Sequence, residues 1–69
     1  MSPEKMTRMA NQIATFFESQ PVPDQAECVA AHFKEFWDPR MLEKLANHLQ
    51  SGGEGLSPLA LEASKRVSV

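Results

Sequence analysis

The chain has 69 residues, a formal net charge of −2 and a single cysteine, Cys28. The net negative charge argues against a surface for nucleic acid or anionic membrane, and the sequence has neither a signal-peptide layout nor an apolar run of about 18 residues that would predict a membrane span. The lone cysteine excludes an internal disulfide and fits a reducing, cytoplasmic compartment. Because a domain this small buries only about 60% of the surface that its unfolded chain exposes, we expect one domain, residues 1–69, that is stabilised by a partner.

A first helix is predicted over residues 3–19. Ser2-Pro3 is a helix-start signal, because serine caps free N–H groups and proline loses no hydrogen bond at the first helical position. At about 100° per residue, the apolar side chains fall within about 60° of one direction: Met6, Met9, Ala10, Ile13, Phe16 and Phe17. Pro21 and Pro23 cannot continue this helix.

A second helix is predicted over residues 25–37. Asp24 followed by Glu27 has the spacing of a capping box, with aspartate as the cap. The apolar face repeats the spacings of the first helix: Ala26, Val29, Ala30, Phe33, Phe36 and Trp37. We interpret the two helices as a hairpin, and if they are antiparallel their aromatic ends lie at its opposite ends.

A sharp corner is predicted between the second helix and a third over residues 39–50. Asp38 supplies the cap and proline follows it at the first helical position. Trp37 and Leu42 have the spacing of a hydrophobic staple, and we expect Trp37 and Phe36 to join the apolar mass beneath the corner. The stripe of the third helix is Met41, Leu42, Leu45 and Leu49.

The chain after the third helix predicts a stop, a turn and a short fourth helix over residues 58–66. Gly52 and Gly53 supply the left-handed conformation of a helix C-cap. Ser57 repeats the cap-plus-proline start, with Leu56 and Leu61 at staple positions. No stretch indicates a strand. The predicted fold is therefore all-α, a small bundle of three helices plus a short C-terminal fourth helix.

The sequence contains no set of residues that favours catalysis or a cofactor site. Cys28 and His32 lie four residues apart on one helix, but two ligands do not make a structural zinc site. His48 is interpreted as a hydrogen-bonding residue near a helix end, because no nucleophile and orienting group accompany it. The carboxylates show no pairing for acid–base chemistry. We expect no catalytic residue, no metal and no cofactor in this chain.

The faces opposite the apolar stripes are the candidates for binding a partner. The first helix presents Arg8, Asn11, Gln12 and Thr15 there, and the third presents Arg40, Glu43 and Asn47. In the fourth helix Leu59 and Leu61 point nearly opposite ways, so one of them needs a cover other than its own core, unless the staple with Leu56 uses Leu61. The candidate partner-binding residues are Arg8, Asn11, Gln12, Phe36, Trp37, Arg40, Leu59 and Leu61.

Three stretches resemble one protein family. They are Arg8-Met9-Ala10-Asn11-Gln12-Ile13-Ala14 with Phe16-Phe17, then Phe36-Trp37-Asp38-Pro39-Arg40-Met41, then Gly52-Gly53-Glu54-Gly55-Leu56 with Pro58-Leu59. In this order they look like the small delta subunit of bacterial, NAD-dependent, molybdenum-containing formate dehydrogenases. The Phe-Trp-Asp-Pro-Arg-Met block is the most specific part of the likeness.

The resemblance implies a cytoplasmic hetero-oligomer that oxidises formate to carbon dioxide and reduces NAD. It implies that molybdopterin, iron–sulfur clusters and FMN belong to the larger subunits, and that this chain is a non-catalytic accessory subunit for assembly or stability. The alternative is a free-standing homodimeric regulatory or DNA-binding helical module. A recognition helix needs a basic face, and the third helix offers Arg40 and Lys44 against Glu43, which disfavours DNA binding.

Overall fold

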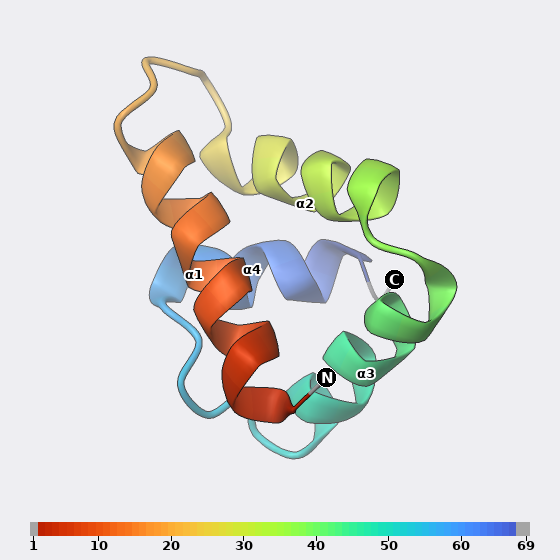
Figure 1. Ribbon diagram of the computed structural model, residues 1–69. Helices are drawn as coiled ribbons and strands as arrows, with labels where there is room; N and C mark the ends of the chain where they lie inside the picture. Colours follow the sequence, from red (N-terminus) through yellow and green to blue (C-terminus); the bar gives the residue numbers. More distant parts are fainter. Residues whose placement is uncertain (1, 68–69) are drawn as a thin grey trace.

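The computed structural model describes residues 2–67, which form four helices. They are α1 (Pro3–Glu18), α2 (Gln25–Phe36), α3 (Pro39–Gln50) and α4 (Pro58–Val67), arranged as in Figure 1. The all-α prediction is confirmed, since residues 2–67 contain no strand. Each helix begins at the residue predicted from the sequence and ends within one residue of its predicted end. None of the helices in this part of the chain is long and apolar enough to cross a bilayer.

Each helix starts where a capping side chain precedes it. The side-chain oxygens of Ser2, Asp24, Asp38 and Ser57 each accept a hydrogen bond from the amide of the third residue further on, at 3.2, 3.2, 2.9 and 3.3 Å respectively. A cap of this kind contributes about 1 kcal/mol, because it satisfies an N–H group that lacks a partner within the helix. The local start signals therefore fix where the helices lie along the chain.

Small side chains let the helices approach one another closely. The fully buried large residues are few, with Phe33, Leu45 and Val29 the largest apolar ones. Most of the remaining core consists of alanines from α1, α2 and α4: Ala10, Ala14, Ala26, Ala30, Ala60 and Ala63. With so little side-chain bulk between the helices, the backbones of α2 and α4 come together, and their contact is the most extensive in the fold.

The hairpin expected from α1 and α2 is not formed. Figure 1 shows α2 leading away from the end of α1 at a steep angle instead of back along it, with α4 passing behind α1 and lying alongside α2. The sequence predicted α4 only as a short fourth helix. In the structure its residues Ala60, Ala63 and Ser64 are buried, and α4 is the main packing partner of α2. The apolar face of α2 could pack mainly on α1 or mainly on α4. The small residues of α4 favour α4, and the spacing of apolar residues along α2 alone does not predict this choice.

At the corner before α3, one of the two predicted core residues is buried and the other is exposed. Trp37 is 6% exposed and stacks on Phe33 with ring centroids 4.4 Å apart, so its predicted place in the core is confirmed. Phe36, expected beside it, is 67% exposed, and that expectation is wrong. Trp37 has left the helical conformation at the C-cap (φ −93°, ψ 136°), which turns its side chain inward. Phe36 keeps the helical register about 60° from Phe33, on the side away from the core.

The end of α3 follows the predicted glycine stop. Gly52 and Gly53 have φ values of 117° and 65°, which L-residues with side chains rarely adopt. The amide of Gly53 donates to the carbonyl of His48 at 3.0 Å, which satisfies a carbonyl at the helix end. Leu61 lies against Gly53, and Leu56 lies within 4 Å of the same point. Leu61 is half-buried and lies over this turn together with Leu56, the residue with which the sequence offers a staple.

Candidate interaction surface

An exposed row of rings joins the C-terminal part of α1 to α2. Phe16 and Phe17 meet edge to face with ring centroids 5.2 Å apart, Phe17 meets the His32 ring at 6.2 Å, and His32 lies 4.5 Å from Phe36. Phe16 is 59% exposed, and it and Phe36 are the large hydrophobic residues most exposed in the described chain. We call Ile13, Phe16, Phe17, His32 and Phe36 the aromatic surface.

The crossing of α1 and α2 assembles this surface. His32 and Phe36 are four residues apart on α2 and therefore lie on one side of it. Phe16 and Phe17 occupy the last turn of α1, which α2 crosses. The expectation that the aromatic residues of the two helices lie at opposite ends of a hairpin is consequently wrong. Phe16, Phe17 and Phe36 instead belong to one row of rings joined through His32, whereas Trp37 is buried.

A small hollow opens within the aromatic surface. Its volume is about 230 Å³, and it is lined by Gln12, Ile13, Phe16, Phe17 and His32. Contiguous exposed apolar side chains with a polar edge are typical of protein–protein contact sites. Phenylalanine rings suit this role because they supply a large apolar area with little conformational entropy to lose. Geometry and composition together indicate a docking face.

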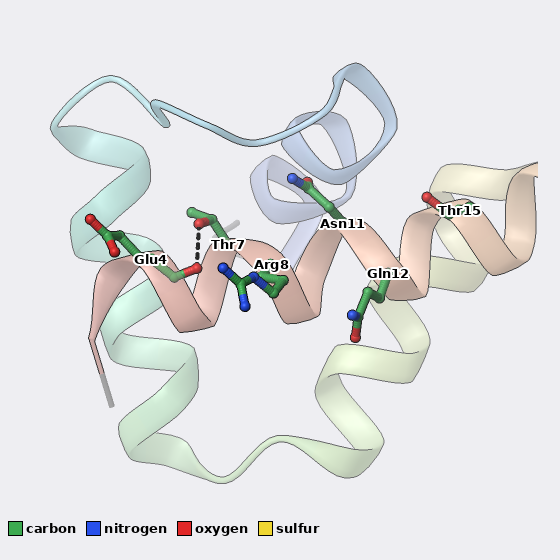
Figure 2. A pocket seen from close by; sticks show the side chains of 6 residues that line it. All are labelled: Glu4, Thr7, Arg8, Asn11, Gln12 and Thr15. Carbon is green, nitrogen blue, oxygen red and sulfur yellow. Dashed lines mark hydrogen bonds between the residues drawn. The ribbon is translucent and has the colours of Figure 1, made fainter.

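A shallow polar groove continues from this face along α1 (Figure 2). Its volume is about 480 Å³, and its lining residues are Glu4, Thr7, Arg8, Asn11, Gln12 and Thr15. The Thr7 hydroxyl donates to the Glu4 carbonyl at 2.9 Å. Gln12 lines both the groove and the aromatic hollow, and Figure 2 shows it pointing away from Asn11. The groove and the aromatic surface are therefore adjacent parts of one side of α1.

The Asn11 side chain is engaged in hydrogen bonds within the chain. Its Nδ2–H donates to the Gly55 carbonyl at 2.9 Å, and its Oδ1 accepts from the Ser57 amide at 2.8 Å. Both hydrogen bonds join α1 to the loop that leads into α4. The sequence placed Asn11 on an outer, partner-binding face, but the loop lies against this side chain and uses both polar atoms of its carboxamide. Its observed role is to hold the loop.

The remaining sequence-predicted partner residues are spread over the molecule. Arg8 and Gln12 are exposed on α1, and Arg40 is exposed at the start of α3. Trp37 is buried, and Leu59 packs against the core. Only Gln12 and Phe36 of the predicted set lie at the aromatic surface. The sequence analysis assigned Phe16 and Phe17 to the core and considered His32 only as a possible metal ligand with Cys28. The four-residue spacing of His32 and Phe36 already indicated that these two rings lie on one side of their helix.

The strongest electrostatic contact lies at the junction of α2 and α4. The Arg66 guanidinium is 2.7 Å from the Asp24 carboxylate and 3.4 Å from that of Glu27. The hydrogen bond from Arg66 holds the pKa of the Asp24 carboxyl below its ordinary value, helped by the bond from the Glu27 amide. Glu27 does not complete the capping box seen in the sequence, because its carboxylate faces Arg66. This cluster joins two helices and is structural.

The candidate ligand and base residues are each accounted for by local contacts. His48 Nε2–H donates to the Glu54 carbonyl at 2.7 Å, as the interpretation of a hydrogen-bonding residue near a helix end predicts. Cys28 is a half-buried free thiol. Within residues 2–67, no three His, Cys, Asp or Glu side chains lie together in a way that could hold a metal ion.

Comparison with known families identifies the group to which the chain belongs. The sequence model of the family described as NADH-dependent formate dehydrogenase delta subunit FdsD matches residues 5–64. The match covers most of the 69 residues, from the first turns of α1 to Ser64 in α4. No match is found among curated proteins or among solved structures. The chain belongs to this formate dehydrogenase delta-subunit family.

Proposed function

We propose that this delta-subunit family member is a non-catalytic accessory subunit of a cytoplasmic, NAD-dependent formate dehydrogenase complex. It supports the assembly or stability of the complex by docking on a larger subunit. The molybdopterin, iron–sulfur and FMN cofactors implied by the resemblance would be held by the larger subunits. The observation that carries the proposal is the aromatic surface, with Phe16 and Phe36 uncovered on a chain that has few large side chains in its core.

The energy available at this surface is of the right size for docking. Full burial of a phenylalanine side chain is worth about 1.5–3 kcal/mol. Phe16 and Phe36 are 59% and 67% exposed, so covering both recovers roughly 2–4 kcal/mol. That corresponds to roughly a hundredfold change in Kd. Two such residues can therefore decide whether a small subunit stays bound.

The test is co-purification of the tagged chain with co-expressed formate dehydrogenase subunits. The double variant Phe16→Ser with Phe36→Ser should lose most of the recovered complex. A matched control on another exposed face, Glu43→Ser with Asn47→Ser, should retain it. Circular dichroism of the free variants checks that both keep the helical fold. A wild-type chain that brings down no dehydrogenase subunit would contradict the proposal.

The homodimeric regulatory or DNA-binding module stands as the alternative function. It predicts a dimer by light scattering and no dehydrogenase bands in the pull-down. Family membership favours the dehydrogenase subunit. The exposed Arg40 lies on the same helix as the exposed Glu43, which does not make the basic face that DNA binding needs.

A further inference from the structure

We infer that the aromatic surface and a basic strip on α1 form one docking face for an amphipathic segment of a larger subunit. That segment carries apolar side chains opposite Phe16 and Phe36 and carboxylates opposite Lys5 and Arg8. The inference rests on the proposed function and names the chemistry of the partner at the same site.

The strip follows from helical geometry. Lys5, Arg8, Gln12 and Phe16 are spaced by three, four and four residues, so they lie along one side of α1. At 1.5 Å per residue the strip is about 16 Å long, which is the length of about three helical turns. All of these side chains are exposed, and Gln12 links the cationic half to the aromatic half.

The charge on the strip is uncompensated. In the described part of the chain, no carboxylate lies within ion-pair distance of Lys5 or Arg8, whereas Arg66 has three carboxylates within 3.4 Å. Glu4 lines the same groove as Arg8 but makes no ion pair with it. A chain of net charge −2 thus presents two cations without an ion-pair partner on the same side of α1 as the exposed Phe16 ring. Carboxylates on the partner are the complementary chemistry.

Pairing α1 with the α1 helix of a second copy does not meet that requirement. Two α1 strips paired antiparallel about Gln12 would place Arg8 of each copy opposite Phe16 of the other. Pairing Arg8 with Glu4 of the second copy would shift the strips so far that Phe16 passes beyond the end of the opposite helix. Neither of these pairings neutralises the cations and covers the aromatic rings together. Since the chain belongs to a dehydrogenase-subunit family, we assign the face to a segment of a larger subunit with its own acidic residues.

The contact is mapped by photo-crosslinking within the complex. Benzoylphenylalanine is placed at position 16, 36 or, as the control on α3, 47, and the tagged chain is purified with the dehydrogenase subunits after irradiation. Positions 16 and 36 should crosslink to one segment of a larger subunit, and the peptide identified by mass spectrometry should contain apolar and acidic residues. Position 47 should give no such product.

The charge component is measured separately by association kinetics. Lys5→Glu with Arg8→Glu should slow association with the larger subunit by about tenfold at low salt, and the difference should shrink as salt is raised. The control Lys34→Glu with Lys65→Glu makes the same change in net charge at exposed positions of other helices and should have a much smaller effect. Equal slowing by both pairs would overturn the role of the strip.

The outcomes separate this inference from the proposed function. Crosslinks to dehydrogenase subunits from position 47 alone would leave docking intact but overturn the assigned face. Crosslinks from position 16 to a second copy, with a dimer by light scattering, would overturn the assigned partner. A peptide without acidic residues would overturn the charge complementarity. A chain that forms no complex with the dehydrogenase would refute the proposed function and this inference with it.

Discussion

Replacing Asn11 by alanine tests whether the loop before α4 is held by this one side chain. The carboxamide makes two hydrogen bonds to that loop, at 2.9 Å to Gly55 and 2.8 Å to Ser57. A hydrogen bond contributes about 0.5–1.5 kcal/mol net, so Asn11→Ala should cost about 1–3 kcal/mol. For a domain of this size the melting temperature should fall by roughly 5–20 °C.

The assay is thermal unfolding of the isolated chain followed by circular dichroism. Gln12→Ala is the matched control, because Gln12 is the next residue on α1, is exposed and should change stability by less than about 0.5 kcal/mol. Asn11→Asp keeps the acceptor for the Ser57 amide but loses the donor to Gly55, and it should fall between alanine and wild type. If Asn11→Ala melts within about 2 °C of wild type, inside the shift of roughly 2–4 °C that a surface change can cause, the loop is held by other contacts.

Three further substitutions probe the corner, the turn and the ion-pair cluster. Trp37→Ala removes a buried aromatic ring, at a cost of roughly 3–5 kcal/mol, and should leave the free chain largely unfolded by circular dichroism. Gly53→Ala should lower stability by more than about 1 kcal/mol in chemical denaturation, because φ is +65° and the new methyl group would lie 2.7 Å from the Leu61 Cδ1 atom. Since Arg66 lowers the pKa of Asp24 in the folded chain, the stabilisation from this pair is present above the carboxyl's ordinary pKa and is lost as the pH falls through the lowered one. Arg66→Ala should therefore raise the Asp24 pKa measured by NMR titration, and an unchanged value would contradict the assigned cause.

The four helices and their starts were predictable because their signals are local. Asp38 with the following proline needs only its own helix to act as a cap, and the observed hydrogen bond of 2.9 Å to the Met41 amide follows from that spacing. The burial of Trp37 was predictable in the same way. The chain turns just before the Asp38 cap, and this local turn directs the side chain of the preceding residue, Trp37, toward the interior.

The aromatic surface was not predictable, because it depends on how α1 and α2 pack together. Phe16, Phe17 and Phe36 were visible as apolar residues on helical faces, but periodicity assigned them to the core. Phe17 is half-buried against the core, but Phe16 and Phe36 are exposed. The most extensive helix contact is between α2 and α4, and the spacing of apolar residues along one helix does not predict it. Asn11 illustrates the converse error. It lies opposite the apolar stripe of its own helix, yet the loop that it binds is 44 residues away in the sequence.

The small core and the exposed rings have a common thermodynamic consequence. Six of the eleven buried hydrophobic residues in the described chain are alanines, whose burial stabilises far less than that of Phe16 or Phe36 would. At about 0.05–0.15 kcal/mol per residue, the free chain has only about 3–10 kcal/mol of stability. A partner present at a hundred times its Kd adds about 2.7 kcal/mol by mass action, which is a large part of that margin. If the chain docks as we propose, a larger subunit that covers the side chains left out of the core would add to the stability of this fold, and folding of the chain would be coupled to assembly of the complex.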